Sequence, residues 1–109
     1  MIIVTVFRTK SEINGFMVEG HSDYAEEGTD IVCASVSILC YTVLNSINLV
    51  AGIEPENMSY DVDEETGLMS LRTLVNNDRT DVIYRSFMVG IELLIEDYSN
   101  YITLKLEEV

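Results

Sequence analysis

The alternation of hydrophobic and polar residues divides the chain into short extended segments and two long helical ones. Residues 2–8 are rich in β-branched side chains, and residues 13–20 alternate so that Phe16 and Val18 face one side. The short polar connector between these segments predicts an antiparallel hairpin. Similar patterns predict three more strands, at residues 57–62, 68–74 and 102–107.

The first predicted helix covers about residues 31–51, and residues 31–53 carry no charge. Thr29 or Asp30 can cap its start, and Gly52 can end it. Its 3.6-residue period separates two faces. The face expected to meet the core holds Leu39, Val43, Ile47 and Val50. The semi-polar stripe on the other side holds Cys33, Ser37, Tyr41, Asn45 and Asn48.

The second predicted helix covers about residues 79–100, and Asn77 or Asp78 can cap it. The acidic cluster at residues 63–67 ends in Gly67 and predicts a hairpin turn between the third and fourth strands. The buried stripe of this helix is predicted at Ile83, Phe87, Ile91, Leu94 and Tyr98.

The resulting order is β-β-α-β-β-α-β within one domain, residues 1–109. Hairpins that are each followed by a helix predict an α+β fold with an antiparallel or mixed sheet covered by two helices. The uncharged run is long enough to span a membrane. Its Ser, Thr and Asn residues and its acidic flanks favour a central core helix, so we expect no membrane partner.

The formal net charge is −13, from 19 acidic and 6 basic residues. Direct binding to nucleic acid is disfavoured because no cationic patch is available to displace counterions. The charge is compatible with a basic protein or peptide partner, and equally with nothing more than solubility.

Cys33 and Cys40 are seven residues apart, about 10 Å of rise on one helix, which is too far for a disulfide. Unpaired cysteines fit a cytoplasmic location, and no basic segment precedes the first strand as it would in a signal peptide. Two cysteines and a single histidine do not give zinc-ligand spacing. We therefore expect neither a metal nor another cofactor.

His21, the single histidine, follows Gly20, and an acidic loop separates it from Cys33 in the first turn of the predicted helix. Unpaired N–H groups and the helix dipole favour thiolate there, and the Cys33 N–H could donate into an oxyanion hole. If the loop folds back, His21 can act as base and acid for a cysteine nucleophile. The alternatives are a buried small hydrophobe at Cys33 and a solvated loop histidine at His21.

The segment Gly20-His21, a short polar loop, and then Gly28-x-Asp30-Ile-Val-Cys33-Ala-x-Val-Ser37 resembles the Prp family of ribosomal-processing cysteine proteases. The resemblance covers nearly the whole chain in length and element order. Ser35 departs from the small residue, such as Ala, expected there. The resemblance implies that Cys33 is the nucleophile and His21 the general base, with Asp30 and Ser37 in supporting positions.

The same resemblance implies a substrate: the N-terminal extension of a large-subunit ribosomal protein, cut after a hydrophobic or aromatic residue. It also implies a homodimer. The competing hypothesis is a non-catalytic assembly factor that binds a ribosomal protein, with Cys33 and His21 as structural residues. A redox-sensing thiol is a third hypothesis. Cys40 is interpreted as core packing.

Residues 22–30 form a nine-residue loop in which four residues are acidic. We expect this loop to be mobile without substrate and to order around a basic peptide, which would bring His21 toward Cys33. Ser37 could hydrogen-bond near the thiol or to its own helix backbone. The expected substrate-gating residues are Gly20, Ser22, Asp23, Tyr24, Glu26, Glu27 and Gly28.

Overall fold

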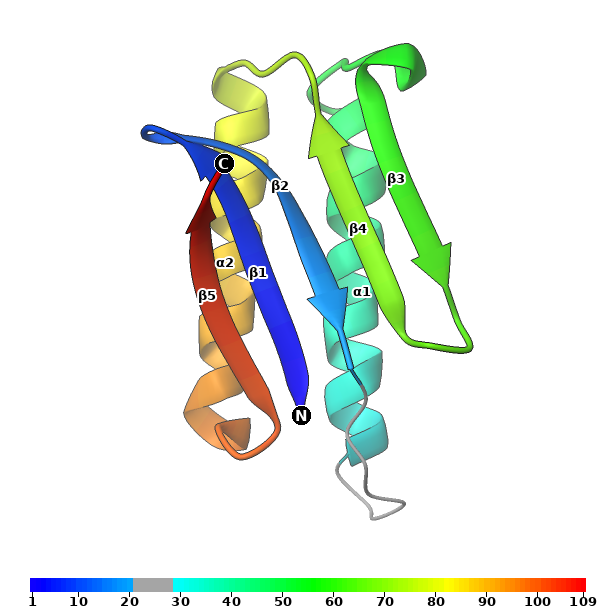
Figure 1. Ribbon diagram of the computed structural model, residues 1–109, viewed down its shortest axis with the longest axis vertical. Coiled ribbons are helices and arrows are strands. Elements are labelled where there is room, and N and C mark those ends of the chain that lie inside the picture. The colour runs from blue at the N-terminus through cyan, green and yellow to red at the C-terminus, as the bar shows by residue number, and fades with distance from the viewer. Residues whose placement is uncertain (21–28) are drawn as a thin grey trace.

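A computed structural model describes residues 1–20 and 29–109 of the chain. One five-stranded sheet packs against two long helices, which run side by side (Figure 1). The elements are β1 (Ile2–Thr9), β2 (Glu12–Glu19), α1 (Thr29–Leu49), a short 3-10 helix (Pro55–Asn57), β3 (Met58–Asp63), β4 (Leu68–Thr73), α2 (Asp78–Tyr98) and β5 (Ile102–Glu108). The predicted element order is confirmed.

The strands lie in the order β3-β4-β2-β1-β5. Neighbouring pairs are antiparallel except β1 with β5, which run parallel, so the sheet is mixed, as the element pattern predicted. The β1–β2 hairpin pairs Val4 with Val18 and Val6 with Phe16. All four side chains are buried, which is why this register is specified.

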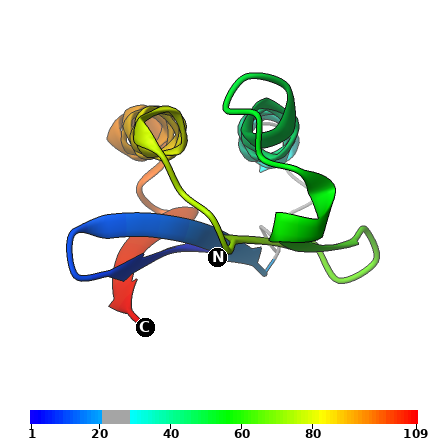
Figure 2. The ribbon, with the colours of Figure 1, turned by 90° about the horizontal axis from the view of Figure 1, so that it is seen from above.

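Both helices cover the same face of the sheet, as the view from above shows (Figure 2). The core lies between the two layers, where the Phe16 and Phe87 rings stack with centroids 4.6 Å apart. The helices approach each other closely because Gly90 leaves room for Leu39: a Cβ on Gly90 would lie 2.8 Å from Leu39 Cδ2.

The amphipathic division of α1 is confirmed in part. Val43 and Ile47 are buried, but Leu39 is only partly buried and Val50 is 58% exposed, so its predicted core position is wrong. The helix has ended by then: Gly52 adopts φ +73°, and its N–H donates to the Asn48 carbonyl. The buried stripe of α1 is Val32, Val36, Cys40, Val43 and Ile47.

The segment Ile31–Leu49 has the length and composition of a membrane-spanning helix. Its buried stripe packs into the common core with the sheet and α2, as expected of a central core helix. The same helix also carries a second, exposed apolar face, which the sequence did not predict.

Helix α2 begins with the predicted Asn77 cap, whose side chain accepts hydrogen bonds from the N–H groups of Arg79 and Thr80. The Thr80 hydroxyl closes the reciprocal bond with the Asn77 N–H. The buried stripe is shifted from the predicted one: Phe87 and Ile91 are buried as expected, while Ile83, Leu94 and Tyr98 are only partly buried. Thr80 and Tyr84 complete the buried side.

Candidate active site

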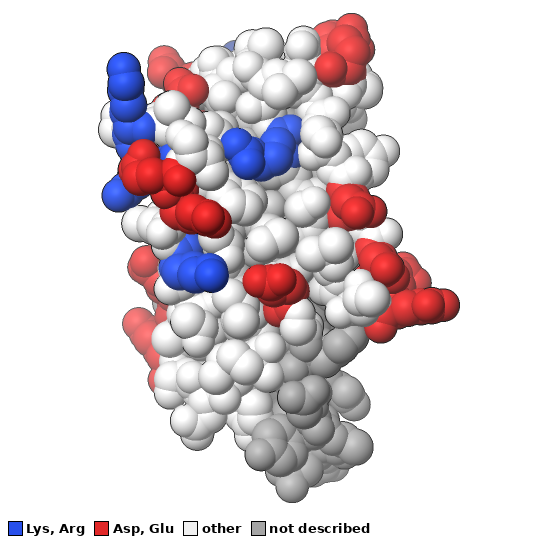
Figure 3. All heavy atoms as spheres, viewed as in Figure 1, with Lys and Arg blue, Asp and Glu red and all other residues white. Residues whose placement is uncertain are grey.

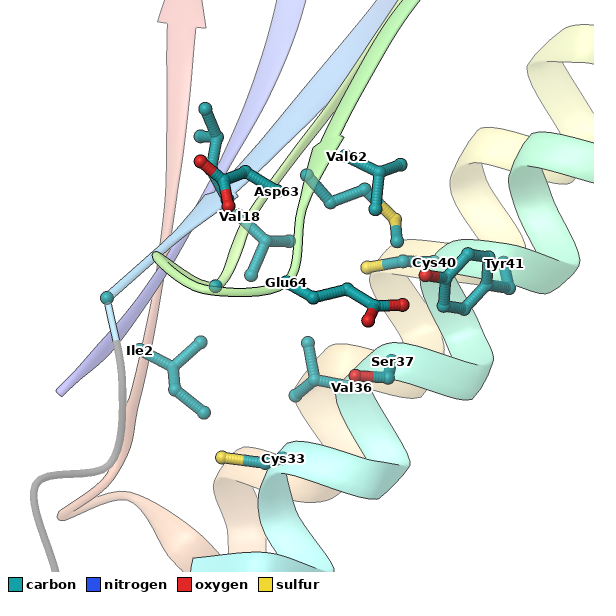
Figure 4. A pocket seen from close by; sticks show the side chains of 14 residues that line it. Ile2, Val18, Cys33, Val36, Ser37, Cys40, Tyr41, Val62, Asp63 and Glu64 are labelled. Carbon is teal, nitrogen blue, oxygen red and sulfur yellow. The ribbon is translucent and has the colours of Figure 1, made fainter.

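A cavity of about 330 Å³ opens between α1 and the sheet beside the β3–β4 turn (Figure 4). It brings together the end of β2, the first half of α1 and the β3–β4 hairpin, which are distant in sequence. Its lining combines apolar, thiol and acidic side chains: Ile2, Val18, Gly20, Cys33, Val36, Ser37, Cys40, Tyr41, Val62, Asp63, Glu64, Gly67, Leu68 and Met69.

The side chain of Cys33 projects from α1 into this cavity, with Sγ on the side of Ile2 (Figure 4). The residue is half-buried and does not form a disulfide. Because α1 begins at Thr29, Cys33 is its fifth residue rather than part of its first turn. A backbone N–H at the fifth position of a helix can reach an intrahelical acceptor, whereas those of the first four cannot. The role of the Cys33 N–H as an oxyanion donor stays a prediction.

Gly20 ends β2 at the wall of the same cavity. Its φ of +87° is one that only glycine adopts at little cost, and a Cβ here would lie 2.3 Å from the Met1 carbonyl oxygen. The close crossing of Gly20 and the first residue fixes where the chain leaves the sheet. The sequence indicated the turn at Gly20, but not this steric requirement.

Cys40 lies two turns further along α1 and is 1% exposed. Burial raises the pKa of its thiol to about 12, so it stays protonated at neutral pH. This agrees with its interpretation as core packing. The two cysteines thus share one helix and one cavity but differ in access to solvent.

Of the other predicted site residues, the structure places Ser37 at the cavity and Asp30 in α1, and it does not describe His21 or residues 22–28. Ser37 is exposed and lines the cavity, but its hydroxyl makes no hydrogen bond within residues 1–20 and 29–109. The bond to the helix backbone considered for Ser37 is made instead by Ser35, whose Oγ donates to the Ile31 carbonyl at 2.7 Å. Asp30 lies in α1, in its second position. His21 and the loop residues Ser22, Asp23, Tyr24, Glu26, Glu27 and Gly28 lie outside the described residues.

Sequence reasoning missed the wall that the β3–β4 hairpin contributes. The acidic cluster before Gly67 was predicted as a turn, and it is one, but its proximity to Cys33 has no local sequence signal. Of the semi-polar stripe, Tyr41 reaches the cavity, whereas Asn48 donates to the Ile53 carbonyl and stabilises the end of α1. Within the described part of the chain, no three His, Cys, Asp or Glu side chains are grouped to hold a metal.

The family model for cysteine protease Prp matches residues 1–103. The chain belongs to this family. Among curated Prp relatives, the ribosomal processing cysteine protease Prp of Staphylococcus aureus is 28% identical over 96 residues, covering 87% of this chain and 88% of that protein. The Prp of Bacillus subtilis is 27% identical over 106 residues, covering 92% of each.

Solved structures show the same fold. The crystal structure of SMU.848 from Streptococcus mutans aligns with a TM-score of 0.85 at 27% identity, over 100% of this chain and 96% of that one. The essential ribosomal processing protease Prp from S. aureus, in complex with a covalently linked product peptide, aligns with a TM-score of 0.81 at 28% identity. That match covers 98% of this chain and 100% of the S. aureus chain. The resemblance read from the Gly20–Ser37 segment is confirmed.

Proposed function

We propose that this member of the Prp family is an endopeptidase in which Cys33 is the nucleophile and His21 the general base and acid. The observation that carries the assignment is the shared cavity: Cys33 and Gly20 both line it, and His21 is bonded directly to Gly20. The other cysteine, Cys40, is too buried and its pKa too high for the role.

The proposed reaction has two steps. His21 takes the proton of the Cys33 thiol, and Sγ attacks the scissile carbonyl; the C–N bond breaks as His21 protonates the leaving amine, which leaves an acyl-enzyme. Water then gives a proton to His21 while its oxygen attacks the acyl carbon. The C–S bond breaks, the carboxyl product leaves, and the Cys33 sulfur takes the proton back from His21. Asp30 and Ser37 are proposed as supporting residues at the start and on the cavity side of α1.

The proposed substrate is the N-terminal extension of a large-subunit ribosomal protein, because relatives across nearly the whole chain are named for ribosomal processing. The apolar floor of the cavity supports a hydrophobic residue next to the scissile bond. We place the reaction in the cytoplasm, where the thiol stays reduced, and propose no direct contact with nucleic acid because the net charge is −13.

A homodimer is the second part of the proposal. Among the described residues, no further layer lies outside the two helices (Figure 2). Both helices carry large apolar side chains that are exposed. We call this surface the outer helix face; it is formed by Ile31, Ile38, Leu49, Val82, Val89 and Leu93, all more than half exposed. Exposed apolar surface of this kind is typical of an interface between copies.

The test of the activity is incubation with the ribosomal protein of the same organism that carries its N-terminal extension, followed by mass spectrometry. Wild type should release the extension at one peptide bond. Cys33→Ala and His21→Ala should bind the protein without cutting it. Cleavage that persists in Cys33→Ala contradicts the mechanism, and binding without cleavage by wild type supports the assembly-factor alternative.

A further inference from the structure

The described part of the cavity beside Cys33 has an apolar floor and a charged side. Its floor, from the sheet and from α1, is apolar: Ile2, Val18, Val36 and Met69. Among residues 1–20 and 29–109, the charged side chains that line the cavity are Asp63 and Glu64, at the end of β3 and in the β3–β4 turn. Of the described residues, a ligand in the cavity therefore meets apolar side chains beneath it and the Asp63 and Glu64 carboxylates on the side of the β3–β4 turn.

The two carboxylates do different things. Asp63 Oδ1 accepts hydrogen bonds from the N–H groups of Glu65 at 3.0 Å and Thr66 at 3.4 Å, so this side chain shapes the turn. Glu64 extends from the turn across the cavity toward α1, on the side where Ser37 and Tyr41 lie (Figure 4). Its carboxylate makes no hydrogen bond or ion pair with residues 1–20 or 29–109.

No Lys or Arg side chain of this chain pairs with Glu64. The six Lys and Arg residues of the sequence all fall within the described residues, and none lines the cavity. Arg8 pairs with Glu108, and Arg85 with Asp81. On the face seen in Figure 3, the Lys and Arg side chains lie in the upper and left part, and no blue side chain lies at the right-hand edge, where acidic side chains are seen.

We propose that Glu64 is a specificity-determining residue that pairs with a Lys or Arg side chain of the peptide substrate while a neighbouring apolar side chain occupies the floor. This inference rests on the proposed protease function and adds a charge requirement to it. Glu64 is exposed, and an exposed pair changes affinity only modestly, so the expected discrimination is about two- to fivefold. The pairing weakens as salt increases.

The first experiment compares peptides that differ only in charge. Peptides spanning the processed bond carry Lys, norleucine or Glu at each position in turn, and kcat/KM is measured for wild type, Glu64→Gln and Glu64→Lys. At one or two positions wild type should prefer Lys to norleucine about two- to fivefold. Glu64→Gln should abolish the preference, and Glu64→Lys should shift it to Glu.

The matched control is Glu65→Gln, which removes one carboxylate from the same turn but not from the cavity lining. It should keep the wild-type preference for Lys. Equal Lys-to-norleucine ratios in wild type and Glu64→Gln overturn the proposal, and so does a loss of preference in Glu65→Gln that matches the loss in Glu64→Gln.

The second experiment needs no substrate. Cys33 is labelled with a cationic and with an anionic methanethiosulfonate reagent, and the ratio of the two rates is measured by mass spectrometry. Glu64→Gln should lower the cationic-to-anionic ratio about two- to fivefold, while Glu65→Gln should lower it less. An unchanged ratio in Glu64→Gln overturns the role of Glu64 whether or not peptides are cut. Absence of cleavage by wild type with a changed ratio refutes the protease function instead.

Discussion

Cys33 and Cys40 line the same cavity from positions two turns apart on α1, yet only Cys33 keeps access to solvent. Cys40 points into the core at 1% exposure, and burial raises the pKa of its thiol to about 12. Two thiols of the same helix therefore differ in reactivity because the packing of α1 on the sheet buries Cys40 and leaves Cys33 partly exposed.

This difference predicts selective alkylation. Iodoacetamide near neutral pH should modify Cys33 in the folded protein and leave Cys40 unmodified, because reaction requires an accessible thiolate. Peptide mapping by mass spectrometry measures both sites. Cys40→Ala should be labelled at Cys33 at the wild-type rate, and both sites should react in urea. Comparable labelling of the two cysteines in the folded protein would contradict the placement of Cys40.

A second prediction concerns stability in alkali. Burial also raises the pKa of Tyr84 to about 12, although its hydrogen bond with Thr73 and the nearby charge of Arg72 oppose the shift. Cys40 and Tyr84 lose their protons at a higher pH in the folded state than in the unfolded state. The unfolded state is therefore stabilised relative to the folded state as pH rises above about 9. The free energy of unfolding should fall from there toward pH 12.

Urea unfolding at a series of pH values between 8 and 10.5 measures this effect, with a limiting slope of about 1.4 kcal/mol per pH unit for each group. In Cys40→Ala the free energy of unfolding should decrease less steeply above about pH 9, and in Tyr84→Phe it should decrease less steeply above about pH 10. Each variant is compared with its own free energy of unfolding at pH 8. If neither variant changes the slope, the assigned shifts are wrong.

A third prediction uses two glycines that share a backbone conformation. Gly20 and Gly52 have φ of +87° and +73°, but only a Cβ on Gly20 would collide, at 2.3 Å from the Met1 carbonyl oxygen. Gly52→Ala should cost about 1–2 kcal/mol from strain alone. Gly20→Ala should cost more and reduce cleavage, because the residue that follows is His21. Urea denaturation and peptide hydrolysis measure the two effects. Equal losses of unfolding free energy in the two variants would show that the backbone at Met1 moves away from the added Cβ at little cost.

The fourth prediction tests the dimer. Val89→Glu places a charge at the centre of the outer helix face and should convert a dimer into a monomer, measured by light scattering at micromolar concentration. Leu74→Glu is the matched control, since Leu74 is 72% exposed on the β4–α2 connection. It should leave the mass unchanged. A monomeric wild type, or a dimer that survives Val89→Glu, would contradict the proposed interface.

The sequence by itself determined the element order, the α+β class and the family, because each depends on local patterns. The alternation of residues 2–8 and 13–20, the cap at Asn77 and the Gly52 terminus all act within a few residues. Val50 was misplaced because a periodic pattern does not indicate where the helix stops. The predicted stripe of α2 was shifted because two polar-tipped side chains, Thr80 and Tyr84, are buried there, and their hydroxyl groups find hydrogen-bond partners.

The candidate site required the tertiary structure. The motif indicated Cys33, but the parallel pairing of β5 with β1 and the position of the β3–β4 turn beside α1 arise from long-range packing. A 3.6-residue period records which side of a helix is apolar, not which distant turn lies next to it. Glu64 acquires its position over the cavity only when the sheet closes against α1, whose Cys33 lies 31 residues earlier in the chain.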